Sequence, residues 1–163
     1  MKPLMAMLLC LSATAAVAQE KEKDFKKESI AIPADNLKWE QPYGPQGPSV
    51  AMVGNKKGPC AIFFKMAAGS ESAWHTHDGW YIGTVIKGTA TSQGQGDAQP
   101  TVLPQGSFFS EPAKKNHKNT CTADGECIVM NWAEKCMTYN AKTADGKTPP
   151  KEPKKEEKKE EKK

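Results

Sequence analysis

The chain contains no arginine: all 23 of its basic residues are lysines, against 19 acidic residues. Without guanidinium groups it has no side chain for bidentate recognition of phosphate, carboxylate or guanine edges. The formal net charge of +4 lies mainly at the ends of the chain. Setting aside the +2 of residues 151–163 and the charge of Lys2 leaves +1 for residues 19–150. A body so close to neutral predicts no nucleic acid among its partners.

Aromatic residues make up only 7% of the chain, whereas it has 13 Gly and 12 Pro. Between residues 29 and 140 no stretch keeps a helical apolar period for three turns, so we expect no long helix there. Short β-branched and aromatic runs alternate instead with turn signals, which predicts strands over residues 49–53, 60–66, 80–86, 89–93, 106–110 and 126–132. The pattern is typical of one all-β domain over residues 29–140, an antiparallel sandwich or barrel.

The first 18 residues have the three parts of a secretory signal peptide. Lys2 precedes an apolar run, and Ala16-Val17-Ala18 fits the small residues required for cleavage before Gln19. A membrane anchor is the alternative, but the apolar run is short for a bilayer. We therefore expect a periplasmic or secreted protein with no stable membrane insertion after removal of the signal. Residues 19–28 are polar and predict a flexible lead-in.

Residues 141–163 have almost no apolar side chains and consist largely of Lys, Glu, Pro and Thr. Such a segment buries too little surface to offset its ordering entropy, so we expect a disordered charged tail. A solvated helix held by Glu–Lys pairs four residues apart is the structural alternative. The balanced charge favours a solubilising appendage over a tether to anionic surfaces.

The chain has no C-x-x-C pair, which argues against a thiolate metal site. Beyond the signal it has four cysteines, at positions 60, 121, 127 and 136. An even number in an exported protein favours disulfides, and sequence alone leaves three connectivities open. In one of them Cys121 and Cys127 close a small loop, which leaves Cys60 for Cys136.

Histidine is also scarce, with three in the whole chain. His75 and His77 are two residues apart, so on a strand their side chains leave the same face. Two imidazoles on one face can share a metal ion, and His117 is the third histidine available to complete the set. The three are therefore candidate metal ligands.

The histidines belong to two motifs, which consist of Gly69, His75-Thr76-His77, Tyr81 and Gly88, and of Pro104-Gln105-Gly106, Pro112 and His117. Their spacing resembles the two motifs of the cupin superfamily, over residues 60–132. The resemblance implies a double-stranded β-helix jelly roll, the cupin barrel. It also implies a metal inside the wider mouth of that barrel.

The sequence departs from the cupin pattern at two positions. The first motif of the family usually carries Glu where Tyr81 stands, and the second often has Asn where Cys121 stands. Three neutral histidines would still suit a divalent transition metal, whether Zn, Cu, Mn, Fe or Ni. Tyr81 is a candidate catalytic residue, as an acid or as a hydrogen-bond donor to a ligand, with direct metal ligation and simple lining of the cavity wall as alternatives.

Other residues near the motifs are weaker candidates. Asp78 should point away from the histidines by strand parity unless Gly79 breaks it, and Glu111 is a second carboxylate that could reach the cavity. Trp74 and Trp80 flank the histidines and could stack on a ring-shaped ligand, although packing is the commoner role.

Two kinds of function fit these features. One is a metal-dependent enzyme that acts on a small organic molecule, and the resemblance is compatible with a dioxygenase, isomerase or lyase. The other is a non-catalytic periplasmic module that binds or senses a small ligand or a metal. Both have a small molecule as partner, and the sequence leaves a homodimer open.

Overall fold

The computed structural model describes residues 23–150, which form two five-stranded sheets with the orders β1-β2-β9-β4-β7 and β10-β3-β8-β5-β6. All neighbouring strands in both sheets pair antiparallel. The strands are β1 (Ser49–Gly54), β2 (Cys60–Met66), β3 (His75–Thr76), β4 (Tyr81–Lys87), β5 (Thr89–Gly94), β6 (Thr101–Pro104), β7 (Phe108–Glu111), β8 (His117–Cys121), β9 (Cys127–Ala133) and β10 (Asn140–Ala141). A single turn of 3-10 helix, η1 (Ala34–Asn36), precedes them. The predicted all-β jelly roll is confirmed.

The six predicted strands are present, and β2 has the predicted bounds. In β9 buried and half-buried residues alternate along the whole strand, as expected for one face turned to the core. Sequence analysis missed β6 and β8, because β8 is rich in Lys, Asn and Thr and β6 ends in a proline. It also missed β3 and β10, which have two residues each.

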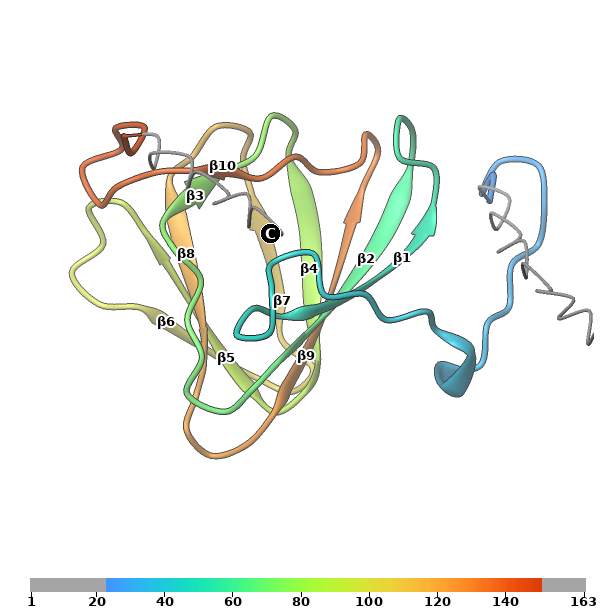
Figure 1. The fold of residues 1–163 in the computed structure, drawn as a ribbon, viewed down its shortest axis with the longest axis horizontal. Helices are drawn as coiled ribbons and strands as arrows, with labels where there is room; N and C mark the ends of the chain where they lie inside the picture. Colours follow the sequence, from blue (N-terminus) through green and yellow to red (C-terminus); the bar gives the residue numbers. More distant parts are fainter. Residues whose placement is uncertain (1–22, 151–163) are drawn as a thin grey trace, which may run out of the picture.

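The two sheets converge at one end and splay apart at the other, so that the barrel has a narrow and a wide end (Figure 1). A core of buried apolar residues fills the region around the β4–β5 turn and consists of Val85, Ala90, Leu103 and Val129, with Phe109 against it. Gly88 makes this turn with φ +75°, and a Cβ there would lie 2.5 Å from the carbonyl oxygen of Glu126. Only glycine fits that position.

Two disulfides join segments of the barrel, and of the three connectivities that the sequence left open they have the one in which Cys121 pairs with Cys127. Cys121–Cys127 joins the end of β8 to the start of β9, and therefore links the two sheets. Cys60–Cys136 ties the segment after β9 to the start of β2.

The ends of the described region are hydrogen bonded. Residues 23–28 of the expected lead-in include a turn in which the carbonyl of Asp24 accepts from the N–H groups of Lys27 and Glu28. Hydrogen bonding continues past the domain boundary expected at residue 140, because Lys142 N donates to the Trp74 carbonyl (2.7 Å). The predicted signal, residues 1–18, and residues 151–163 of the predicted tail lie outside the described residues.

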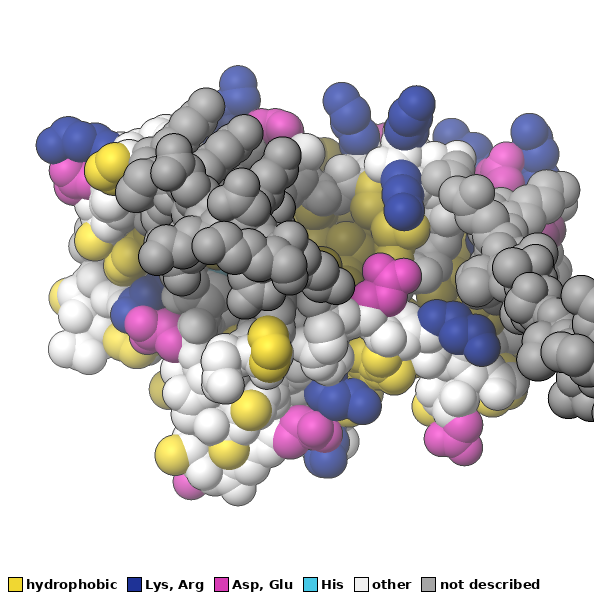
Figure 2. Space-filling model, in the orientation of Figure 1, with side chains coloured by type: hydrophobic (Ala, Val, Ile, Leu, Met, Phe, Trp, Pro, Cys, Tyr) yellow, Lys and Arg dark blue, Asp and Glu magenta, His cyan; other side chains and the backbone are white. Residues whose placement is uncertain are grey.

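Lysine and acidic side chains are scattered over the visible face of the molecule and do not gather in a single patch (Figure 2). Helical structure within residues 23–150 offers no segment with the length and hydropathy needed to cross a bilayer.

Candidate functional site

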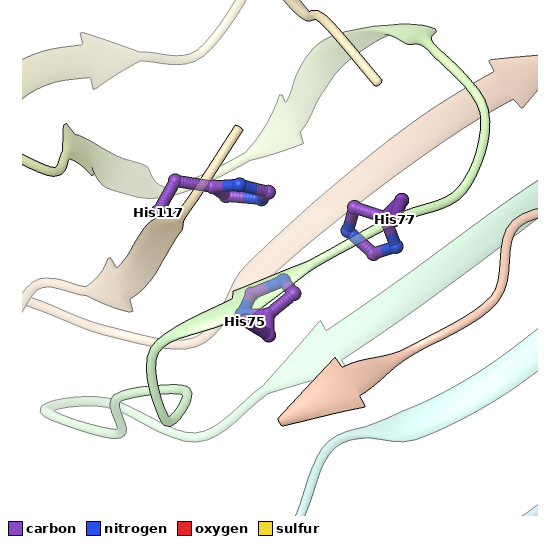
Figure 3. A group of neighbouring side chains, drawn as sticks. All are labelled: His75, His77 and His117. Carbon is purple, nitrogen blue, oxygen red and sulfur yellow. The ribbon is translucent and has the colours of Figure 1, made fainter. Parts of the chain in front are cut away.

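The three histidines come together from two neighbouring strands of one sheet. His75 opens β3, His77 follows its last residue, and His117 opens β8 directly opposite His75. All three side chains are buried. One ring nitrogen from each lies within 4.8 Å of the other two. Figure 3 shows the rings gathered around one space, with His77 on the stretch of chain that directly follows the strand of His75. The shared face predicted from their spacing is therefore present.

Backbone carbonyls fix the orientation of all three rings through Nδ1. The Nδ1 atom of His75 lies 2.8 Å from the Ala73 carbonyl, and that of His117 lies 3.0 Å from the Lys115 carbonyl. Nδ1 of His77 is hydrogen bonded to the carbonyl of Thr138. With the proton on Nδ1, each ring keeps its lone pair on Nε2, the form in which imidazole binds a metal.

Burial keeps two of the rings neutral at physiological pH. Desolvation, together with a smaller contribution from His117, lowers the pKa of His75 to about 3 and that of His77 to about 4. Neutral imidazoles with oriented lone pairs are what a divalent transition metal requires. The ring nitrogens lie within 4.8 Å of one another, whereas three ligands about 2.1 Å from one ion are at most about 3.6 Å apart. The residues present therefore fit a single ion after the rings move inward toward it.

Tyr81 reaches the same cluster from the other sheet. It opens β4 rather than continuing β3, because the chain bends between the two strands. The phenol is buried, and in the metal-free protein its hydroxyl donates to Nε2 of His117 at 3.1 Å, a hydrogen bond that has to break before this nitrogen can bind an ion. Burial, and to a smaller extent the charge of Glu111, raises the pKa of this phenol above its usual value. Tyr81 therefore stays protonated and is a hydrogen-bond donor rather than an anionic ligand.

The two candidate carboxylates have opposite environments. Asp78 is exposed and its Oδ1 accepts from Asn140 Nδ2 (3.2 Å), so it points away from the histidines as expected from parity. Glu111 is buried and lies opposite Tyr81 in the β4–β7 ladder. Its Oε2 is 4.0 Å from Nδ1 of His117.

A cavity of about 270 Å³ opens beside the histidines in the wider part of the barrel. His75, His77 and Tyr81 form part of its wall, whereas His117 is fully buried and lies outside the lining. Most of the remaining wall is apolar, from Val50, Ile62, Phe64, Met66, Leu103, Phe109 and Val129. Among the described lining residues only Glu71 has a formal charge, and it pairs with Lys118 at 2.9 Å. The cavity therefore favours a small, largely apolar molecule.

Two tyrosines that sequence analysis did not single out lie in the cavity lining. The ring of Tyr139 stacks on His75, with centroids 4.6 Å apart, and Tyr43 lies 5.5 Å from Tyr139. Both are partly exposed, so their rings are available to a ligand. The suggested stacking role of the tryptophans is not supported: neither Trp74 nor Trp80 lines this cavity, and Trp80 packs against Trp132.

Two lining residues that the sequence analysis did not name, Tyr139 and Asn131, could have been predicted from the sequence. Tyr139 lies three residues after Cys136, so the Cys60–Cys136 pairing alone would bring it to the wide part of the barrel. Asn131 is a polar residue at an inward position of β9, between Val129 and Ala133. It lines the cavity, and its Oδ1 has no hydrogen-bond partner among the described residues.

The jelly roll with three inward-facing histidines defines a protein of the cupin superfamily. The chain belongs to the ChrR cupin-like domain family, whose model matches residues 27–135. The resemblance drawn from the two motifs is thereby confirmed at the level of the superfamily.

Solved structures share this fold at low sequence identity. An uncharacterised protein with a double-stranded β-helix domain from Klebsiella pneumoniae is 22% identical, with a TM-score of 0.56 over 70% of this chain and 97% of that one. KdgF from Halomonas is 16% identical, with a TM-score of 0.55 over 66% and 96%. The polyketide cyclase RemF from Streptomyces resistomycificus is 12% identical, with a TM-score of 0.58 over 65% and 79%. No curated protein matches the chain.

Proposed function

We propose that this chain is an exported cupin that holds one divalent transition-metal ion through His75, His77 and His117 and acts on a small organic molecule in the adjoining cavity. The observation that carries the proposal is the buried cluster of three imidazoles, each fixed at Nδ1 by a backbone carbonyl. When bound, such an ion supplies Lewis-acid or redox chemistry, and Zn, Cu, Mn, Fe and Ni all accept imidazole ligands.

The residues around the cluster have separate tasks. Tyr81 holds its proton at the phenol oxygen and can donate it, or a hydrogen bond, to a substrate atom beside the histidines. Tyr139 stacks on His75 and restricts its ring, and the apolar wall excludes water from the reacting group. We therefore assign Tyr81 as the catalytic donor and the histidines as the ligand set.

The cavity supports a compact substrate with an apolar body. Its volume of about 270 Å³ is at the small end for ligand sites, and none of the described residues in its wall is a lysine. An anionic group of a substrate would therefore have to be met by the metal. A structural neighbour described as DMSP lyase and the polyketide cyclase RemF support small-molecule chemistry in this fold, but leave the substrate open.

A non-catalytic ligand- or metal-binding module is the second candidate. It is favoured by the scarcity of acid–base groups, because the one carboxylate in the lining, Glu71, is engaged by Lys118.

A panel of small phenols, ketones and carboxylic acids added to the Co(II)-loaded protein separates the two functions. We expect some compounds to change the Co(II) absorption spectrum and to be converted, with conversion lost in Tyr81→Phe. Spectral change without conversion would support the binding module, and no response to any compound would contradict both.

Export is part of the proposal, and the two disulfides support it because they are compatible with an oxidising compartment. Expression of the full chain followed by cell fractionation tests it. We expect mature protein that begins at Gln19 in the exported fraction, whereas full-length protein with four free thiols in the cytoplasm would contradict it.

A further inference from the structure

Glu111 is the one buried carboxylate among residues 23–150. Its Oε1 accepts a hydrogen bond from Ser92 Oγ (3.3 Å). Its Oε2 is fully enclosed and has no hydrogen-bond partner among the described residues. Burying a carboxylate without a cation or a full set of hydrogen-bond donors costs free energy of folding. The burial of Glu111 therefore needs a physical explanation.

The unpartnered oxygen faces the histidine cluster from behind. Oε2 of Glu111 lies 4.0 Å from Nδ1 of His117, while the N–H of that nitrogen is directed at the Lys115 carbonyl at 3.0 Å. On the opposite side of the same ring, Nε2 receives the hydroxyl of Tyr81. Because Glu111 and Tyr81 are cross-strand partners, the β4–β7 ladder holds both side chains against His117.

A divalent ion held by three neutral imidazoles brings two positive charges into a buried site. The protein interior is a poor dielectric, so a negative charge a few ångströms behind one ligand stabilises the ion much more than it would in water. A nearby carboxylate also raises the basicity of the metal-binding nitrogen of a histidine. Neither effect needs a direct bond between the carboxylate and the ion.

We propose that Glu111 is a positioning residue of the metal site: its carboxylate, 4.0 Å from Nδ1 of His117, acts through that ring and balances part of the charge of the ion. This inference rests on the proposed metal site and goes beyond it, because it assigns a function to a residue outside both the ligand set and the cavity wall. It also accounts for the burial of a carboxylate oxygen that lacks a partner.

The test is the affinity of purified, metal-free protein for Co(II), measured by competition with a chromophoric chelator, together with the absorption spectrum of the Co(II) form. Glu111→Gln keeps the shape of the side chain and removes its charge. We expect it to weaken binding by about 10- to 100-fold and to shift the Co(II) bands. Glu111→Asp, which keeps the charge, should recover part of the affinity.

Glu126→Gln is the matched control, because it removes a carboxylate that pairs with Lys87 on the surface. It should leave both the affinity and the spectrum unchanged. If Glu111→Gln does not fold, Ser92→Ala takes its place, since it removes the hydrogen bond that holds the carboxylate. A shifted Co(II) spectrum in this variant supports the inference.

The role of Glu111 would be overturned if Glu111→Gln binds Co(II) with wild-type affinity and an unchanged spectrum. The same result in Ser92→Ala would overturn it if Glu111→Gln does not fold. In either case the proposed function would still stand. Wild-type protein that binds no Co(II) would instead overturn the metal site itself.

Discussion

The two sheets contribute different chemistry to the same site. The sheet that contains β3 and β8 supplies three imidazoles, whose carbonyl partners hold their lone pairs ready for a metal. The sheet that contains β4 and β7 supplies Tyr81 and Glu111, a protonated phenol and a carboxylate that meet at His117. Electron-pair donors therefore come from one sheet, and the proton and the negative charge from the other.

This division means that metal binding and proton donation can be disturbed separately. His117 is the point of contact, because both side chains of the second sheet act on its ring. Substitutions in the first sheet should remove the metal, whereas substitutions in the second should adjust its affinity or remove a proton donor.

The largest expected effect is loss of the metal from the first sheet. His75→Ala removes one of three ligands and should weaken Co(II) binding by about 1,000-fold. This loss is about 4 kcal/mol of the roughly 10 to 16 kcal/mol with which a structural site binds its metal. Thr76→Ala is the control on the same strand, because Thr76 lines a different pocket on the far side of β3. Chelator competition on both variants measures the effect, and equal affinities would contradict the ligand assignment.

The disulfides should differ in their contribution to stability and to the site. Cys60–Cys136 closes a loop with a separation of 76 residues, against 6 for Cys121–Cys127. Because the stabilisation by a disulfide increases with the length of the loop that it closes, replacing Cys60 and Cys136 by alanines should lower the free energy of unfolding by about 4 kcal/mol. Replacing Cys121 and Cys127 should lower it by about 2 kcal/mol. Urea denaturation measures both.

Only the first replacement should also weaken metal binding, because Cys136 anchors the segment whose Thr138 carbonyl holds His77. The prediction would be wrong if both disulfide variants lost the same amount of Co(II) affinity.

Acid should destabilise the metal-free protein through the first sheet. The folded pKa values of His75 and His77, about 3 and about 4, lie below the ordinary value of 6.5, so the unfolded chain binds more protons between these limits. Stability is therefore complete above pH 6.5 and falls as the pH drops toward the folded values. From pH 7 to 5.5 the loss should be about 1 kcal/mol per histidine.

Urea denaturation in the presence of EDTA measures this loss at both pH values. In the double variant His75→Gln, His77→Gln the dependence on pH over this range should become nearly flat, whereas an unchanged slope would show that other groups cause it.

The smallest expected effect comes from the phenol. Tyr81→Phe removes the hydrogen bond to His117 and should lower the stability of the metal-free protein by about 1 kcal/mol. Because a protonated phenol is not an anionic ligand, Co(II) affinity should stay within about threefold of wild type. A large loss of Co(II) affinity would show that Tyr81 is a metal ligand, and would contradict the assignment of all the ligands to one sheet.

The sequence predicted those parts of the fold and site in which the local residue pattern alone determines the structure. Strand 60–66 has the residue types and the turns at both ends that a strand needs, and its bounds were correct. His75 and His77 were placed on one face because alternation along an extended chain leaves no other arrangement. The two cupin motifs then brought His117 to them.

What the sequence could not provide depends on contacts between distant segments. Tyr43 and Tyr139 lie in irregular loops without a motif, and only the three-dimensional structure brings their rings within 5.5 Å. The role of Glu111 rests on its position opposite Tyr81, which is a matter of strand register. β8 was missed because its side chains are polar, although His117 at its start and Cys121 at its end are buried.

The most direct test of the central claim is the metal content of wild-type protein, expressed as the full chain without a histidine tag, purified and measured by inductively coupled plasma mass spectrometry. The three-histidine site predicts about one divalent transition-metal ion per chain in wild type and almost none in His117→Ala. Wild-type protein that carries no ion and takes up none on dialysis against Zn(II), Mn(II) or Cu(II) would contradict it.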